Sequence, residues 1–506
     1  MKKILLALMM LALATIACVR DTPEVIVITA TFLPQNTAEL ALATSTPIGE
    51  LPLLPSVTVI PNNQPSSYVV RPGDTLTIIA EQNGTTVETL LEINDIADQN
   101  TLFVGQIIEL PSTPLVEGSE YIIMADSKLV RGPGVSDFDV LAFAEAQNRF
   151  ISRAVDEVNH VELTAGQVVN RVSLEYSVDP RLLFALLEYL GGWLSRDTGS
   201  EDNPLGAPAY SNGVDRRGVY LQLAWAADNL NRGYYAKQAQ QIRTMELADG
   251  TRVRINQDIN AATTGLQYLF SRIRDYNQWQ KDVSPEGFAL TYRALFGDPF
   301  QNSIVPLVPD NLTQPTLELP FANAQTWFYT GGPHGGWGSG SAWAAVDFAP
   351  PDDLDTVTSS CYVSSFYATA AAPGVIARTD EGTVVLDLDG DGDESTGWTI
   401  LYLHIASEGR INAGASVSPG DRIGRPSCEG GFSNGTHLHL ARRYNGEWIP
   451  ADCSTCVLHP RPAFVIGAWA VLGLPNQEYQ GYMTNGSRQI VAEQGRNIAD
   501  NRITWQ

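Results

Sequence analysis

The sequence predicts a multidomain chain in which a small βααβ module is followed by a mainly α-helical region and then by a mainly antiparallel β region. Length is the first observation, because 506 residues are enough for several hydrophobic cores. Apolar periodicity is the second: residues 117–310 carry apolar side chains at helical spacing, for example from Arg181 to Leu194. Turn chemistry is the third. Short strand-like runs after residue 320 are separated by Gly- and Asn-rich turns, and Asn445-Gly446 is a strong hairpin signal.

The first 18 residues have the pattern of an export signal. Lys2 and Lys3 precede an apolar run that ends at Ala17, and this run is too short to span a bilayer comfortably. The Ala17-Cys18 pair resembles the processing site of bacterial lipoproteins, which implies a lipid on Cys18. Thr15 stands where that motif usually has Leu, and the alternative is ordinary signal cleavage nearby. We therefore expect an exported protein at the cell surface or in the cell envelope, anchored to the membrane by lipid.

Residues 19–66 are rich in Thr, Pro, Ala and small polar residues, so they predict an extended tether. The formal net charge of −24 argues against general nucleic-acid binding, because no basic surplus is available to neutralise phosphates. The sequence leaves the oligomeric state open. An even number of cysteines remains after Cys18, which in an exported chain predicts two disulfides. These cysteines are Cys361, Cys428, Cys453 and Cys456.

Residues 67–112 form the βααβ module. Strand-like runs at 68–70 and 106–110 enclose two helical segments that are separated by Asn83-Gly84. The opening Arg71-Pro72-Gly73-Asp74-Thr75-Leu76 and the Asn94-Asp95 pair make the module resemble a LysM domain, which implies binding of N-acetylglucosamine-containing glycans such as peptidoglycan. Turn and N-cap chemistry is the alternative role for Gly73 and Asp74. By resemblance the sugar would lie against Gly73, Asp74, Thr75, Leu76, Asn94, Asp95 and Ile96.

Residues 117–310 form the helical region. Val178-Asp179-Pro180-Arg181, followed by an apolar run to Glu188, resembles the entry to the catalytic helix of lysozyme-like lytic transglycosylases. The resemblance implies that Glu188 is an acid that protonates a glycosidic oxygen. Tyr189 stands where that family usually has Ser, and no second carboxylate is assignable. We therefore favour a scaffolding or glycan-holding role and keep a second catalytic acid as the alternative. Residues 311–320 follow as a linker.

Four of the six histidines lie between Gly331 and Ile449, within the last domain, residues 321–460. His437 and His439 are two residues apart on a predicted strand, so both imidazoles face one side. Asp347 lies on another predicted strand, and His334 lies in a Gly-rich loop before it. Two His, one Asp and a water make a plausible catalytic zinc set, and the remaining imidazoles, including His404, suit proton transfer. No His-Glu-x-x-His helix is present.

Several motifs then resemble lysostaphin-like zinc endopeptidases, in particular the staphylolysin and beta-lytic branch. They are Gly331-Gly332-Pro333-His334, Gly338-Ser339-Gly340, Tyr402-x-His404, Cys428-Glu429-Gly430-Gly431, His437-Leu438-His439 and Tyr444-Asn445-Gly446. The resemblance implies that His334, Asp347 and His439 ligate zinc, while His404 and His437 assist the water and the tetrahedral intermediate. Many relatives have a His four residues before the Asp, where this chain has Trp343. The branch also implies a Cys361–Cys428 disulfide, and for Cys453 and Cys456 we favour a short-loop disulfide.

A cluster of carboxylates lies between two strand-like runs of this domain. It begins like a calcium loop, but its twelfth position is Trp398 instead of Glu. Calcium binding and a solvated hairpin tip are the two interpretations. The carboxylates concerned are Asp387, Asp389, Asp391 and Asp393. The C-terminal extension, residues 461–506, has short apolar runs that could add strands, and no chemistry is evident in it.

The function predicted from these residues is a zinc endopeptidase that hydrolyses peptide cross-links of bacterial peptidoglycan and is held to glycan by its LysM module. Trp337, Trp343 and Trp448 are expected to line its groove, with core packing as their alternative role. One alternative function is a non-catalytic envelope protein that binds peptidoglycan and activates another hydrolase. The other is a bifunctional enzyme that also cuts glycan through Glu188.

Overall fold

The computed structural model describes residues 67–505, except 72, 84, 95, 97–101, 112–114, 208–209, 212–213, 354, 356, 358, 454–455, 457–459 and 497–498. The predicted export signal, Cys18, the tether and Asp95 lie outside the described residues. Within the described part of the chain, no helix combines the length and the apolarity needed to cross a bilayer.

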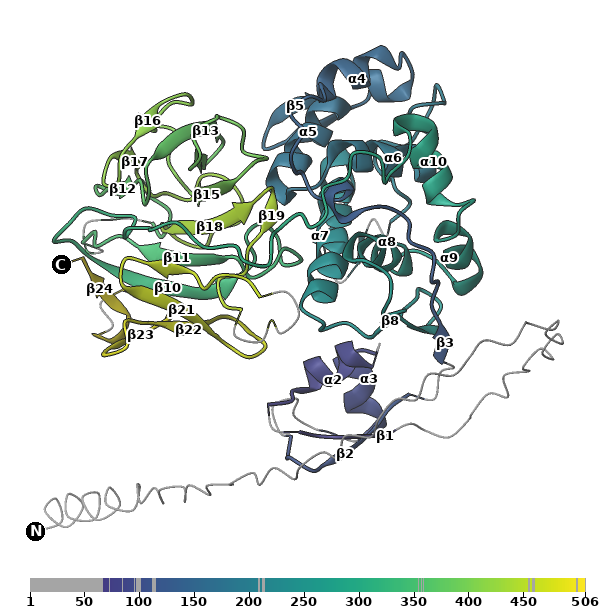
Figure 1. The fold of residues 1–506 in the computed structure, drawn as a ribbon, viewed down its shortest axis with the longest axis horizontal. Coiled ribbons are helices and arrows are strands. Elements are labelled where there is room, and N and C mark those ends of the chain that lie inside the picture. The colour runs from purple at the N-terminus through teal and green to yellow at the C-terminus, as the bar shows by residue number, and fades with distance from the viewer. Residues whose placement is uncertain are drawn as a thin grey trace, which may run out of the picture. The chain divides into compact units, whose positions relative to one another are not determined.

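The βααβ module has the predicted element order (Figure 1). Its elements are β1 (Ser67–Val69), α2 (Leu76–Gln82), α3 (Val87–Ile93) and β2 (Ile107–Glu109). The two strands pair antiparallel, with Tyr68 opposite Ile108. Leu76, Ile79 and Leu90 from the helices pack on Ile108 and form a small core of their own. This confirms the predicted fold of the module.

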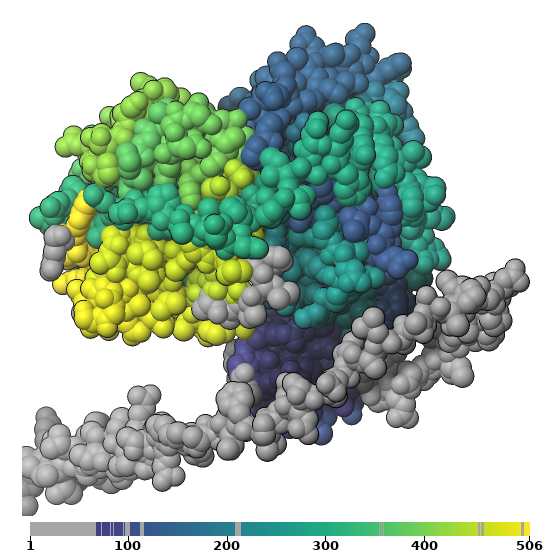
Figure 2. All heavy atoms as spheres, viewed as in Figure 1, coloured from purple at the N-terminus to yellow at the C-terminus, as the bar shows by residue number. Residues whose placement is uncertain are grey.

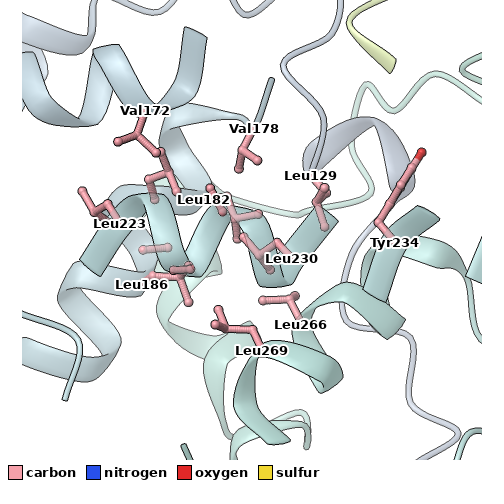
Figure 3. Packing of buried hydrophobic residues seen from close by; sticks show 14 of the residues in the cluster. Leu129, Val172, Val178, Leu182, Leu186, Leu223, Leu230, Tyr234, Leu266 and Leu269 are labelled. Atoms are coloured by element: carbon pink, nitrogen blue, oxygen red, sulfur yellow. The ribbon is translucent and has the colours of Figure 1, made fainter. Parts of the chain in front are cut away.

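The region from 115 to 310 is mainly helical, as predicted. Its helices are α4 (Val140–Ala146), α5 (Ala165–Tyr176), α6 (Pro180–Gly191), α7 (Val219–Gln238), α8 (Ala261–Ser271), α9 (Tyr276–Asp282) and α10 (Phe288–Phe296). A capping box of Thr164 and Gln167 starts α5, and Asp179 caps α6 before Pro180. Leucines from α6, α7 and α8 meet in the core between these helices (Figure 3).

Short elements that the sequence did not predict complete the helical region. They are β3 (Leu115–Glu117), β4 (Val155–Val158), β5 (Val161–Thr164), β6 (Tyr210–Ser211), β7 (Val214–Asp215), β8 (Thr244–Glu246), β9 (Arg252–Arg254) and the 3-10 turns η1 (Asp126–Lys128) and η2 (Phe150–Ser152). All of them are two to four residues long, which is too short for a period-two pattern to be recognised.

An antiparallel sheet organises the last domain, in the order β16-β13-β14-β15-β18-β11-β10-β24, with β19 beside β18. The strands are β10 (Thr326–His334), β11 (Ala345–Ala349), β13 (Gly374–Asp380), β14 (Thr383–Asp387), β15 (Trp398–Leu403), β16 (Ser416–Val417), β18 (Leu438–Tyr444), β19 (Glu447–Trp448) and β24 (Arg502–Thr504). A separate pair joins β12 (Ala368–Thr369) to β17 (Arg422–Gly424). The mainly antiparallel prediction is therefore confirmed.

The C-terminal extension adds β24 to this sheet and forms a second sheet of four strands, β20 (Val465–Ile466), β21 (Trp469–Leu474), β22 (Gln477–Thr484) and β23 (Gln489–Val491). The segment predicted as a linker is also packed. Leu317 and Leu319 are each 3% exposed and belong to the core of the sheet. Its Pro and Thr residues were typical of a linker, but the two leucines bury enough apolar surface to fix the chain on the sheet.

The sheet buries both of its faces, which explains the almost continuous burial of β18. Val384, Tyr402 and Leu440 point into a core with the C-terminal extension. Their neighbours Val385, Leu401 and Ala441 point the other way, into the core that also holds the helices. The helical region and the sheet therefore share one apolar core, and side chains of both regions meet in Figure 2. His439 is two residues from Ala441 and lies on this shared face.

Candidate metal centre

Three adjacent strands carry the predicted zinc ligands. Asp347 on β11 lies directly opposite His439 on β18, so their side chains are cross-strand neighbours. On the other side of β11, Gly331 of β10 is opposite Asp347, and His334 is opposite Ala345. Three residues of β10 thus oppose two of β11, and this bulge turns His334 to the face that Asp347 uses. Gly331 is required there, since a Cβ would approach Asp347 Oδ2 within 2.4 Å.

The three ligand atoms form a compact triangle. His334 Nε2 lies 3.0 Å from His439 Nδ1 and 3.2 Å from Asp347 Oδ1, and the third side measures 3.3 Å. Nitrogen and oxygen ligands about 2.0–2.1 Å from a tetrahedral zinc ion lie about 3.3 Å apart, so the triangle fits. Asp347 Oδ1 is buried and accepts no hydrogen bond among the described residues. Such an orphaned lone pair is what a missing cation would satisfy.

Backbone carbonyls fix both ligand histidines. His334 donates from Nδ1 to the Gly332 carbonyl at 2.7 Å, and His439 donates from Nε2 to the Gly336 carbonyl at 3.0 Å. These bonds leave the unprotonated nitrogen of each ring facing the centre of the triangle. Burial alone would raise the pKa of Asp347, but the imidazoles of His334 and His437 hold that pKa well below its usual range. The carboxyl therefore stays ionised and available as a ligand.

The two other predicted histidines lie beside the triangle. The ring centroids of His404 and His437 are 4.5 Å apart, and His437 Nε2 is 3.7 Å from Asp347 Oδ1. Nδ1 of His404 donates to the Glu429 carbonyl, and Nδ1 of His437 donates to the Gly435 carbonyl. Burial and the neighbouring His437 lower the pKa of His404 to about 3. His404 is therefore neutral near pH 7 and keeps a lone pair on Nε2.

An open pocket of about 750 Å³ contains all five of these residues. Trp337 lies on its wall, and Phe432 at its rim is 92% exposed. Trp448 does not line it: this side chain is 1% exposed and packs in the shared core. Trp343 is also absent from the described lining. Of the three tryptophans, only Trp337 was correctly predicted to line the groove.

The C-terminal extension contributes to this pocket, which the sequence analysis did not predict. The Tyr479 ring stacks on His334 with centroids 4.3 Å apart, and Glu478 accepts a hydrogen bond from the Gly335 amide. Arg496 binds the Thr436 carbonyl at 2.7 Å and also lines the pocket. A hairpin at Pro475-Asn476 was the only local signal, and it does not say where the next strand packs.

Both predicted disulfides are present. Cys361–Cys428 joins the two segments that form one side of the pocket, and Cys453–Cys456 closes a short loop.

Glu188 has a structural role in this fold. One carboxylate oxygen accepts hydrogen bonds from the amides of Leu194 and Ser195, at 2.8 and 3.1 Å. These bonds close the loop after α6, which accounts for the residue without acid catalysis. The transglycosylase role of Glu188 stays a prediction.

Turn chemistry similarly accounts for some of the predicted glycan contacts. Gly73 has a φ of 91°, Asp74 accepts from Tyr68 and Arg71, and Asn94 bonds the backbone of Glu109. Glycan binding at Gly73, Asp74, Thr75, Leu76, Asn94 and Ile96 stays a prediction, and Asp95 lies outside the described residues.

Calcium at the acidic loop is not supported. Oxygens of Asp387, Asp389 and Asp391 lie within 4.8 Å of one another, but Asp387 already accepts hydrogen bonds from the Gly390 and Gly392 amides. Asp393, the fourth expected ligand, is outside this group and bonds Ser395 and Ser136 instead. The solvated hairpin tip is the interpretation that these bonds favour.

Comparison with known proteins adds two family matches. Residues 68–111 match the LysM domain, and residues 122–309 match the LasA N-terminal domain. Protease LasA of Pseudomonas aeruginosa is 25% identical over 296 residues, which cover 54% of this chain and 65% of LasA. The chain thus spans just under two thirds of the length of this relative. The N-acetylmuramoyl-L-alanine amidase XlyB of Bacillus subtilis is 50% identical over 48 residues, 10% of this chain and 15% of XlyB.

Solved structures show more distant likenesses. The M23 metalloprotease pseudoalterin, from the deep sea, has 23% identity and a TM-score of 0.27, over 36% of this chain and 96% of pseudoalterin. The catalytic domain of lysostaphin from Staphylococcus simulans has 21% identity and a TM-score of 0.18, over 25% of this chain and 89% of that domain.

The chain therefore combines a His–Asp–His triangle with sequence similarity to protease LasA. A match to the LysM domain, at residues 68–111, precedes these features in the chain. The lysozyme-like character of the helical region stays a prediction, because the family that matches there is the LasA N-terminal domain.

Proposed function

We propose that this protein is a zinc-dependent endopeptidase that hydrolyses the peptide cross-links of bacterial peptidoglycan. The observation that carries the proposal is the triangle of His334 Nε2, Asp347 Oδ1 and His439 Nδ1, whose buried carboxylate oxygen has no other described partner. A zinc ion held there would supply an activated water and polarise a substrate carbonyl. A complete ligand set favours an enzyme over the non-catalytic alternative, which does not require one.

The chain's own residues would handle the protons. The Nδ1 proton of His404 is committed to the Glu429 carbonyl, so we assign proton acceptance to the lone pair on its Nε2. His437 has the same arrangement with the Gly435 carbonyl, and it is close to Asp347. A proton accepted by either imidazole would then be available to the leaving amine. The open pocket of about 750 Å³ leaves room for a peptide beside these residues.

The match of residues 68–111 to the LysM domain supports a cell-wall substrate. In the proposal it retains the enzyme on glycan and raises the local concentration of cross-links near the pocket. Export and a lipid on Cys18 remain part of the proposal, and they place the enzyme at the cell surface.

The test uses the purified full chain with peptidoglycan, with and without a chelator, and analyses the fragments by mass spectrometry. We expect new amino and carboxyl termini that disappear with chelator and return with zinc. Protein that binds zinc but releases no peptide fragments would overturn the proposal. Anhydro-sugar ends that are lost in Glu188→Gln would reveal the bifunctional alternative.

Two variants separate the roles of the histidines. His439→Ala should lose zinc and activity together, because it removes a ligand atom. His404→Ala should keep zinc and lose about 10²–10⁴-fold in turnover, as expected for a proton-transfer group. Zinc content and single-turnover rates measure the two effects, and a fully active His404→Ala would contradict its role.

A further inference from the structure

The loop at 335–341 connects β10 to β11 and forms part of the zinc site. Its Gly336 carbonyl accepts the hydrogen bond that orients His439, and its Trp337 lines the pocket. Gly335, Gly336, Gly338 and Gly340 give this loop high conformational entropy, so fixing it requires strong contacts. Ser341 supplies internal ones, since its hydroxyl bonds the Trp337 amide and the Gly338 carbonyl.

The remaining contacts come from the helical region. Asp228 on α7 accepts a hydrogen bond from the Gly340 amide at 2.7 Å, and its other oxygen lies 3.4 Å from Ser339 Oγ. Arg232, one turn further along α7, donates to Ser339 Oγ at 2.7 Å. The approach is close enough to require glycine: a Cβ at Gly340 would lie 2.0 Å from the Asp228 carbonyl oxygen.

The other end of the loop rests on Trp448 of β19, which is in turn bonded to the helical region. A Cβ at Gly336 would meet the Trp448 ring at 2.4 Å, so the backbone lies directly on the indole. The indole N–H of Trp448 points to the Tyr176 carbonyl at 3.3 Å, and its amide donates to Tyr235 Oη at 2.9 Å. Tyr176 belongs to α5 and Tyr235 to α7, so these two helices fix the Trp448 side chain against which Gly336 packs.

We propose that Asp228 is a positioning residue of the zinc site: its carboxylate holds the 335–341 loop so that the Gly336 carbonyl fixes the His439 imidazole. The proposal rests on the zinc-binding part of the proposed function. Among the described residues, those that line the pocket lie between Thr330 and Arg496, so α7 supports the site from behind without covering it. In the full chain, the helical region then supports the metal centre.

The experiment measures zinc affinity of the full chain, made metal-free by a chelator, by competition with a zinc indicator. Residues that hydrogen-bond a metal ligand typically contribute about 10–100-fold to metal affinity. Asp228 does not contact His439 itself but holds the loop that does, so its effect should lie at the low end of this range. We therefore expect Asp228→Ala to raise the zinc Kd about tenfold and to shift the visible absorption bands of the cobalt-substituted protein. Asp228→Asn, whose amide oxygen can still accept from Gly340, should restore the Kd to within about threefold of wild type.

Ser136→Ala is the matched control. Ser136 is exposed and bonds Asp393 across the same two regions at 2.7 Å, away from the loop. Its Kd and cobalt spectrum should equal those of wild type. A folded Asp228→Ala with the Kd and spectrum of Ser136→Ala would overturn the proposal. If Asp228→Ala does not fold, Ser339→Ala provides the test, because it removes from an exposed position a hydroxyl that both Asp228 and Arg232 contact. A Kd equal to that of Ser136→Ala would again overturn the proposal.

The same measurements separate this inference from the proposed function. A wild-type chain that binds zinc but cuts no peptide would overturn the proposed function and leave the positioning role to be decided by the variants. A wild-type chain that binds no zinc would overturn both.

Discussion

At the scale of single residues, hydrogen bonds and burial distinguish the histidines of the site. His334 and His439 keep one nitrogen free for a metal because the other donates to a carbonyl. His404 is 2% exposed and stays neutral far below the pKa of a free imidazole. The sequence motif does not distinguish these histidines, whereas their hydrogen bonds and their burial in the folded chain do.

This neutrality predicts a pH dependence of stability in the metal-free protein. His404 has a pKa of about 3 when folded and 6.5 as the ordinary value, so the unfolded chain binds its proton more readily. Its contribution is fully present above pH 6.5 and is lost as the pH falls toward 3. Between pH 7.5 and 5.0 the loss is about 2 kcal/mol. The free energy of unfolding is measured with urea at both pH values. Between them, His404→Gln should lose about 2 kcal/mol less stability than wild type. Equal losses would show that His404 is not buried as a neutral group.

At the scale of elements, the pocket is formed by segments that are tied together by side chains. The Ser360 carbonyl accepts from the Thr436 amide, and the Tyr362 amide donates to Thr436 Oγ1, next to the Cys361–Cys428 disulfide. These bonds connect two loops that carry no regular secondary structure. Their geometry therefore depends on the cross-link more than on propensity.

The two disulfides form a matched pair for a prediction. Cys361–Cys428 spans 67 residues and Cys453–Cys456 spans three. Loop-closure entropy gives the long cross-link about 4 kcal/mol and the short one about 1–2 kcal/mol. Cys361→Ala with Cys428→Ala should therefore lower the free energy of unfolding more than Cys453→Ala with Cys456→Ala. The first pair should also raise KM more than it lowers kcat, since the pocket wall loosens. Denaturant unfolding and steady-state kinetics measure these effects; the reverse order of stability would contradict the argument.

At the scale of the whole molecule, the helical region and the sheet behave as one folding unit, because they share a core and buried polar bonds. Glu447 on β19 is 2% exposed, accepts from Tyr234 Oη at 2.8 Å and pairs with Arg461 at 2.8 Å. Ser177 Oγ also donates to the Gly446 carbonyl at 2.6 Å. Once the core has formed, water does not reach these groups, so it cannot replace the hydrogen bonds between them.

Calorimetry should therefore show one transition for these two regions. Tyr234→Phe removes one hydrogen bond and should cost about 1–3 kcal/mol. Glu447→Ala leaves the Arg461 guanidinium buried without its carboxylate and should cost about 3–5 kcal/mol. Each variant should lower the Tm of that single transition without splitting it into two. Two separate transitions, of which only one shifts, would show that the regions unfold independently.

The sequence by itself determined the βααβ module, the helical character of the second region and the antiparallel character of the third, because each depends on local periodicity and turn chemistry. Its motifs also predicted His334, Asp347 and His439 as one metal site, and the structure brings their ligand atoms within 3.3 Å of one another. Tertiary structure alone decided which distant side chains support them. Asp228 and Gly340 are 112 residues apart, and Tyr479 reaches His334 through a sheet of the C-terminal extension. Such contacts depend on how whole elements pack, and no local pattern of residues encodes that packing.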